Sequence, residues 1–68
     1  MPTELEQLVD RGNAARYAND FAAAAEAYEA ALKLAPDNAP IQAALGLTRL
    51  AEGDYARFLH VHAAQFLD

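Results

Sequence analysis

The sequence contains no cysteine and no serine, and only three glycines and three prolines in 68 residues. Without cysteine the chain forms no disulfide and offers no thiolate to a structural metal ion. Serine and cysteine are also common nucleophiles in covalent catalysis, and no glycine-rich phosphate-binding loop is present. We therefore expect a protein that is not an enzyme and that needs no cofactor.

Basic clusters and long apolar runs are missing as well. Ten acidic residues outnumber five basic ones, so the net charge is −5 and the surface repels phosphate backbones. No apolar run is long enough to cross a membrane, and no basic segment followed by an apolar one marks a signal peptide. We expect a cytoplasmic protein that binds neither nucleic acid nor a membrane.

The chain is short enough to form only one domain, residues 1–68. A domain of this size buries only about 60% of the surface that its unfolded chain exposes, so its stability margin is thin. Disulfides and structural metals are the usual remedies, and both are excluded by the lack of cysteine. The remaining way to stabilise so small a domain is association with a partner or with another copy of the chain.

Eighteen alanines predict an all-α protein, because alanine has the highest helix propensity. Thr3 and Glu6 have the spacing of a capping box, which predicts a first helix over 4–17. Asp20 is the expected cap of a second helix over 21–34, ended by Pro36. Asn38 is the expected cap of a third helix. A turn at Gly53-Asp54 leads into a fourth, over 55–67, which makes four helices in all.

The two halves of the sequence correspond at an offset of 34 residues, which is the period of a tetratricopeptide array. The offset pairs two glycines, two aspartates and two aromatic residues: Gly12 with Gly46, Asp20 with Asp54, and Phe21 with Tyr55. The chain resembles the tetratricopeptide repeat family at positions of its small and aromatic signature: Leu8, Gly12, Asn19, Asp20, Phe21, Ala24, Tyr28, Ala31, Pro36, Ile41, Leu45, Gly46, Gly53, Asp54 and Tyr55. The resemblance implies two helix-turn-helix hairpins, about 4–37 and 38–68, in a segment of a right-handed α-α superhelix. It further implies a protein-interaction module.

The final stretch departs from this pattern. Phe58 and Leu59 stand where the first repeat has Ala24 and Ala25, and such large side chains do not fit the same close packing. Leaving four large apolar side chains of this stretch exposed would forfeit roughly 6 to 12 kcal/mol. We therefore expect self-association, as a homodimer, through apolar residues of the second repeat and one histidine. These residues are Phe58, Leu59, His62, Phe66 and Leu67.

The apolar side chains of this stretch can also be buried in ways other than a homodimer. The oligomer can be larger than a dimer, or the missing part of a longer protein can cover the last helix. The last two helices can also be exchanged between chains, in which case one long helix would run through Gly53. The Gly53-Asp54 pair argues against such a helix.

His60 and His62 suggest a metal site, but residues two apart on a helix point roughly 200° away from each other. They cannot chelate one ion together, and no metal site is predicted. His62 is instead expected to be a hydrogen-bonded residue of the interface.

The family resemblance also implies a groove, because the first helices of the repeats line a concave surface that binds protein or peptide partners. Its expected residues in this chain are Glu6, Val9, Asn13, Arg16 and Tyr17 from the first repeat and Pro40, Ala43, Leu47, Leu50 and Ala51 from the second. Val9 and Ala44 stand where family members that hold a carboxylate have lysine and asparagine, so that clamp is not expected. Two alternatives stay open: a purely structural oligomerisation domain, and an accessory domain of a larger protein.

Overall fold

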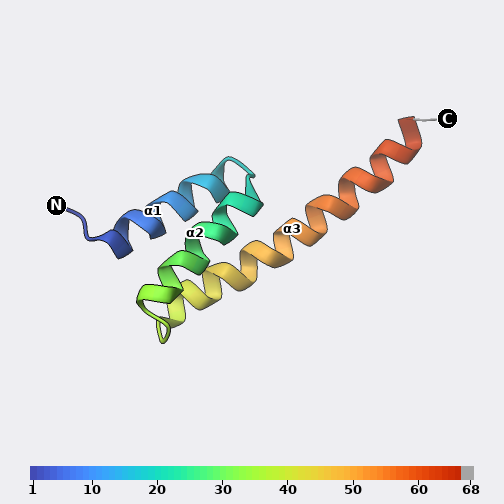
Figure 1. Ribbon diagram of the computed structural model, residues 1–68. Coiled ribbons are helices and arrows are strands. Elements are labelled where there is room, and N and C mark those ends of the chain that lie inside the picture. The colour runs from blue at the N-terminus through green and yellow to red at the C-terminus, as the bar shows by residue number, and fades with distance from the viewer. Residues whose placement is uncertain (67–68) are drawn as a thin grey trace.

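The computed structural model describes the backbone of residues 1–66 and the side chains of residues 1–57. Every regular element in this part of the chain is a helix: α1 (Glu4–Tyr17), α2 (Phe21–Leu34) and α3 (Ala39–Phe66). α1 and α2 form an antiparallel hairpin, and α2 lies between α1 and the first half of α3 (Figure 1). The all-α prediction is confirmed, whereas the predicted number of four helices is wrong. None of the three described helices has a stretch long and apolar enough to span a bilayer.

Capping interactions place the start and the end of α1. The Thr3 hydroxyl oxygen accepts a hydrogen bond from the Glu6 amide at 3.1 Å, which satisfies one free donor of the first turn. Acidic residues in that turn and Arg16 in the last turn both complement the helix dipole. α1 has the bounds that the sequence predicts.

The turn between α1 and α2 depends on Asn19, which has a φ of 63°. Asparagine tolerates this left-handed conformation better than most residues. The Asp20 amide donates to the Ala15 carbonyl at 2.8 Å and the Asn19 amide to the Arg16 carbonyl at 3.0 Å, which is the pairing of a Schellman motif. Asp20 then caps α2, as predicted, by accepting from the Ala23 amide at 3.2 Å.

The connection from α2 to α3 is equally local. α2 ends at Leu34, two residues before Pro36, and the Ala35 amide donates to the Ala31 carbonyl at 3.0 Å. The Asn38 side chain accepts a hydrogen bond from the Ile41 amide at 3.1 Å, so Asn38 is the predicted cap of α3. Pro40 is tolerated in the first turn because no intrahelical donor is needed there.

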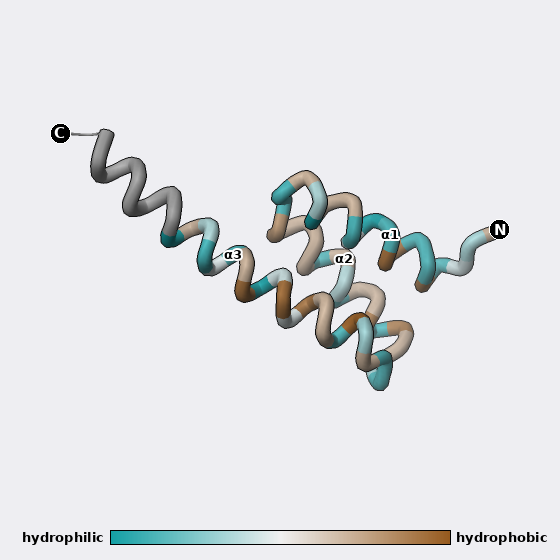
Figure 2. The backbone as a smooth tube through the Cα atoms, turned by 180° about the vertical axis from the view of Figure 1, so that it is seen from behind, coloured by the Kyte–Doolittle hydropathy of each residue, from teal (hydrophilic) through white to brown (hydrophobic). Residues whose placement is uncertain are grey.

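The core lies on both sides of α2. Its buried apolar residues are Ala24, Tyr28, Ala31, Ile41 and Leu45. Thr48 is also fully buried, and its hydroxyl donates to the Ala44 carbonyl at 2.7 Å, so no polar atom is left without a partner there. Hydrophobic positions are spaced along α1 and the coloured first part of α3 and do not form a single run, as expected for helices with one buried face (Figure 2).

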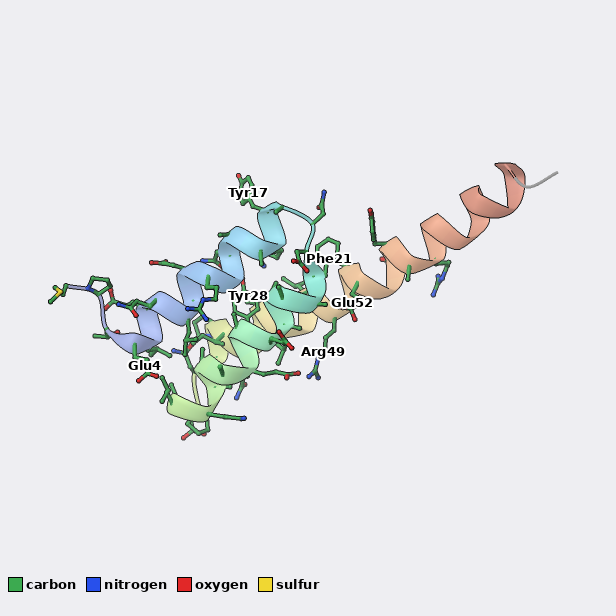
Figure 3. The ribbon with its side chains drawn as sticks, turned by 45° about the horizontal axis from the view of Figure 1, so that its top comes forward. Glu4, Tyr17, Phe21, Tyr28, Arg49 and Glu52 are labelled. Carbon is green, nitrogen blue, oxygen red and sulfur yellow. The ribbon has the colours of Figure 1, made fainter. Side chains whose placement is uncertain are left out.

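The alanines of α2 and a glycine of α1 allow the two helices to approach closely. A Cβ atom added to Gly12 would lie 2.6 Å from Cε1 of Tyr28, so the Tyr28 ring rests directly on the α1 backbone. Figure 3 shows Tyr28 on the α1 side of α2. The close approach expected from the small side chains of Gly12 and Ala24 is confirmed, because both residues are buried.

The predicted break at Gly53-Asp54 is wrong, because α3 runs without interruption from Ala39 to Phe66. No glycine has a positive φ, so Gly53 lacks the left-handed geometry that ends α1 at Asn19. One glycine costs a helix only about 1 kcal/mol, which is too little to break it without a packing reward for folding back. The packing energy to be gained by folding back is reduced, because Phe58 and Leu59 stand where α2 has the alanines that let it lie close to α1.

α3 is therefore twice as long as its neighbours, with 28 residues against 14 in α2. At 1.5 Å per residue it extends about 42 Å, and its second half projects past the end of the hairpin (Figure 1). Within the described residues, 39–66 consequently form one helix in place of the second hairpin that the sequence predicts.

Candidate functional site

A hollow of about 350 Å³ lies between the first half of α1 and the start of α3. Residues of α1 form one wall, and the α2–α3 turn with the first turn of α3 forms the other. The lining residues are Leu5, Glu6, Val9, Asp10, Asn38, Pro40 and Ile41.

The floor of the hollow is apolar. Leu5 and Val9 are one helical turn apart on α1, and both are half-buried against the core. Ile41, only 4% exposed, reaches the same place from the first turn of α3. The Asn38 cap fixes the direction in which α3 starts, so a local hydrogen bond positions one wall of the hollow.

The rim of the hollow is acidic. Glu6 and Asp10 are also one turn apart on α1, and both are exposed. Within residues 1–57 the ion pair that forms is elsewhere, between Arg49 of α3 and Glu29 of α2. Two carboxylates without a cationic partner at the edge of an apolar depression attract a positively charged group.

Asn13 and Arg16, two of the predicted groove residues, meet at Tyr28. The Tyr28 hydroxyl donates a hydrogen bond to the Asn13 side-chain oxygen, and Cζ of Arg16 lies 6.0 Å from the centre of the Tyr28 ring. That distance is at the limit of a cation–π contact. Tyr17 is not part of this cluster: it is 93% exposed at the end of α1 and points away from the hairpin (Figure 3).

Apart from Pro40, the predicted groove residues of the second repeat lie away from the hollow. Ala43, Leu47 and Leu50 share one side of α3 and are exposed, the two leucines by 60% and 64%. Among the ten residues predicted for the groove, Glu6, Val9 and Pro40 line the hollow. The predicted residues thus do not form one groove. Some line the hollow, Asn13 and Arg16 lie at Tyr28, Tyr17 stands apart at the end of α1, and the others lie further along α3.

Sequence reasoning missed four of the seven residues of the hollow, Ile41 among them. Leu5, Asp10 and Asn38 were not expected there, although the spacing of Leu5 and Val9 by one turn is a signal for a shared face. The role of Tyr28 as the partner of Asn13 was missed too, because the two residues lie in different helices.

The residues predicted for self-association fall outside the described side chains. Phe58, Leu59, His62 and Phe66 belong to the part of α3 for which the structure describes only the backbone, and Leu67 lies beyond the described residues. In the part of the chain with described side chains, no three or more acidic or histidine side chains gather at a place that could hold a metal ion.

Comparison with known families identifies the hairpin. Residues 6–38 match the family model described as tetratricopeptide repeat. The chain contains a tetratricopeptide repeat. The match spans α1 from its first turn, all of α2 and the turn up to the cap of α3, and it confirms the resemblance carried by the first repeat. Comparison with curated proteins and with solved structures finds no match to the chain.

The tetratricopeptide repeat accounts for the main packing contact of the hairpin. Gly12 and Tyr28 both lie within the matched residues, and their contact sets the distance between α1 and α2. Tetratricopeptide repeats are protein-interaction modules, and the hollow lies at the edge of this repeat, where α3 packs beside it.

Proposed function

We propose that the chain is a non-enzymatic protein-interaction module that binds a segment of a partner protein and self-associates through residues 38–68. The observation that supports partner binding is the hollow between α1 and α3, with its apolar floor and acidic rim. Its volume is at the lower end of the range of ligand pockets, which suits one or two side chains of a peptide.

The chemistry of the hollow favours a partner segment that is both apolar and basic. Leu5, Val9 and Ile41 suit a large apolar side chain, while Glu6 and Asp10 suit a lysine or arginine beside it. The net charge of −5 adds a longer-range attraction for such a segment, and salt should weaken it.

The test uses two end-blocked synthetic peptides that differ only in charge. One carries a phenylalanine flanked by lysines and the other the same phenylalanine flanked by glutamates. Fluorescence anisotropy should show binding of the lysine peptide alone, with at least tenfold weaker binding to Val9→Glu. Gln7→Glu is the matched control, because Gln7 is exposed on α1 outside the hollow. Equal binding by Val9→Glu, or no binding of the lysine peptide, would remove the hollow as the binding site.

Self-association is supported by the composition of the second half of α3. Residues 55–66 contain Tyr55, Phe58 and Phe66 together with Leu59 and Val61, and they belong to a helix that projects past the hairpin. The test is the solution mass at several concentrations for the wild type and for the double variant Phe58→Asp, Phe66→Asp. A wild type that stays monomeric at all concentrations would contradict this part of the proposal.

A purely structural oligomerisation domain is the second candidate function, and the projecting half of α3 is the observation that favours it. Val9→Glu, measured for both peptide binding and solution mass, separates the two candidates. The interaction module predicts weaker binding of the lysine peptide with the oligomer intact, since Val9 lines the hollow. The structural domain predicts no change in either measurement.

A further inference from the structure

Asn13 and Arg16 continue the face of α1 that borders the hollow. Around a helix, positions 13 and 16 lie about 40° and about 20° from position 9, so the three side chains leave α1 in similar directions. Arg16 lies about 10.5 Å beyond Val9 along the helix axis, at about 1.5 Å per residue. A segment bound in the hollow can therefore run along this face of α1 and reach Arg16.

Tyr28 determines which atoms of Asn13 and Arg16 remain available. Its hydroxyl donates to the side-chain oxygen of Asn13, which leaves the Nδ2 amide group of Asn13 as a donor. The Arg16 guanidinium, with Cζ 6.0 Å from the centre of the Tyr28 ring, can only donate. Tyr28 is fully buried and rests on Gly12, so the support under both side chains is fixed. The pair therefore offers neighbouring donors, one of them charged.

Arg16 has no acidic partner among the described side chains. The ion pair found there joins Arg49 to Glu29, between α3 and α2. Arg16 is half-buried, so water and salt screen its charge less than they screen a fully exposed one. Glu6 and Asp10 lie at the other end of α1, beside the hollow. This side of α1 is thus acidic next to the hollow and basic next to Tyr28.

We propose that Asn13 and Arg16 bind a carboxylate side chain of the same partner segment that places an apolar and a basic residue in the hollow. This inference rests on the partner binding proposed above and adds an acidic residue to the sequence that the site recognises. An extended segment advances about 3.3 Å per residue, so the acidic residue lies about three positions from the apolar one. A guanidinium donates two parallel hydrogen bonds to a carboxylate, and the Asn13 amide can donate another.

The net charge of the chain predicts the opposite preference. Ten acidic residues against five basic ones repel an added glutamate at long range. Tighter binding of a segment that gains a glutamate therefore requires local donors at the place where that glutamate lies. The sign of the effect alone separates a carboxylate site at Arg16 from the field of the whole chain.

The test uses three end-blocked peptides with the same core, a phenylalanine between two lysines. The reference peptide has glutamine three positions before and three positions after the phenylalanine, and each of the other two has glutamate at one of these places. Fluorescence anisotropy should show one glutamate peptide binding roughly three- to tenfold more tightly than the reference, as expected for charge-assisted hydrogen bonds. One order alone should gain, because the segment runs along α1 in one direction.

Arg16→Gln should remove this gain, and Arg11→Gln is the matched control. Both variants lose one positive charge from α1, but Arg11 is exposed about 200° around the helix from Val9. Asn13→Asp keeps the acceptor for the Tyr28 hydroxyl and should also remove the gain, because its carboxylate takes the place of the bound one. Circular dichroism checks that the variants keep their helix content.

Two results would overturn the carboxylate site while the hollow stands as the binding site. One is that neither glutamate peptide binds more tightly than the reference, and the other is that Arg16→Gln and Arg11→Gln reduce the gain equally. A reference peptide that does not bind at all would overturn the hollow and the carboxylate site together.

Discussion

The rings of Phe21 and Tyr55 meet edge to face, with their centres 5.9 Å apart and their planes at 69°. Phe21 opens α2, and Tyr55 lies on α3 two residues after Gly53. This contact attaches α3 to the hairpin just before the helix leaves it. The two residues also correspond at the offset of 34, so equivalent positions of the two halves contact each other.

Tyr55→Ala should lower the free energy of unfolding by about 0.5 to 1.5 kcal/mol beyond the loss of buried area, the usual contribution of an aromatic pair. Urea denaturation followed by circular dichroism measures the change. Arg57→Ala is the control, because Arg57 is exposed on the same helix and its loss should cost less than about 0.5 kcal/mol. Equal effects of the two substitutions would mean that the ring contact does not stabilise the protein.

Gly12→Ala and Gly53→Ala should change stability in opposite directions. The added methyl group at 12 collides with the Tyr28 ring, which is fully buried and cannot move freely, so we expect a loss of about 1 to 3 kcal/mol. The methyl group at 53 meets nothing, and replacing glycine within a helix should gain about 0.5 to 1 kcal/mol. Both variants are compared by urea denaturation at one protein concentration, since association would shift the midpoint. A stabilised Gly12→Ala would contradict the close approach of α1 and α2.

The hydrogen bond from Tyr28 to Asn13 should appear as a coupling energy in a double-mutant cycle. Tyr28→Phe and Asn13→Ala each remove the same bond, and each should cost about 1 kcal/mol. The double variant should cost less than the sum of the two single variants, because the bond can be lost only once. Additive losses would show that the two groups do not interact in solution.

The cap of α3 can be tested with two neighbouring residues. Asn38→Ala removes the acceptor for the Ile41 amide and should cost about 1 kcal/mol. Asp37→Ala, one residue earlier at an exposed position of the turn, should change stability by less than about 0.5 kcal/mol. Thermal unfolding of the two variants side by side separates a cap from a general effect of the turn. If the two variants have the same midpoint temperature, the Asn38 side chain does not stabilise the protein as a cap.

The starts of α1, α2 and α3 and the ends of α1 and α2 were predictable because they depend on short-range interactions. Thr3, Asp20 and Asn38 each accept a hydrogen bond from an amide three residues ahead. Both partners of such a bond lie within one turn of the same segment, so the sequence contains all the information needed. The residues of the first repeat, including Gly12 and Tyr28, were recognisable for a related reason: they recur in a family pattern, and residues 6–38 match it.

The candidate site was less predictable, because its members come from distant segments. Leu5 and Ile41 line the same hollow although 36 positions separate them in the sequence. Periodicity along α1 indicated which of its residues share a face, but it did not indicate which part of α3 lies opposite. That pairing depends on where α3 packs along α2.

The sequence by itself determined that the chain is helical, where α1 and α2 begin and end, and that Asn38 caps the next helix, since capping and propensity act over a few residues. Tertiary structure decided the rest. Asn19 forms a tight turn because α2 gains packing against Gly12, whereas Gly53 remains helical, and Phe58 and Leu59 follow it where α2 has two alanines. A weak turn signal bends a helix only when the folded-back segment recovers the cost by packing, and that balance depends on contacts between residues far apart in the sequence.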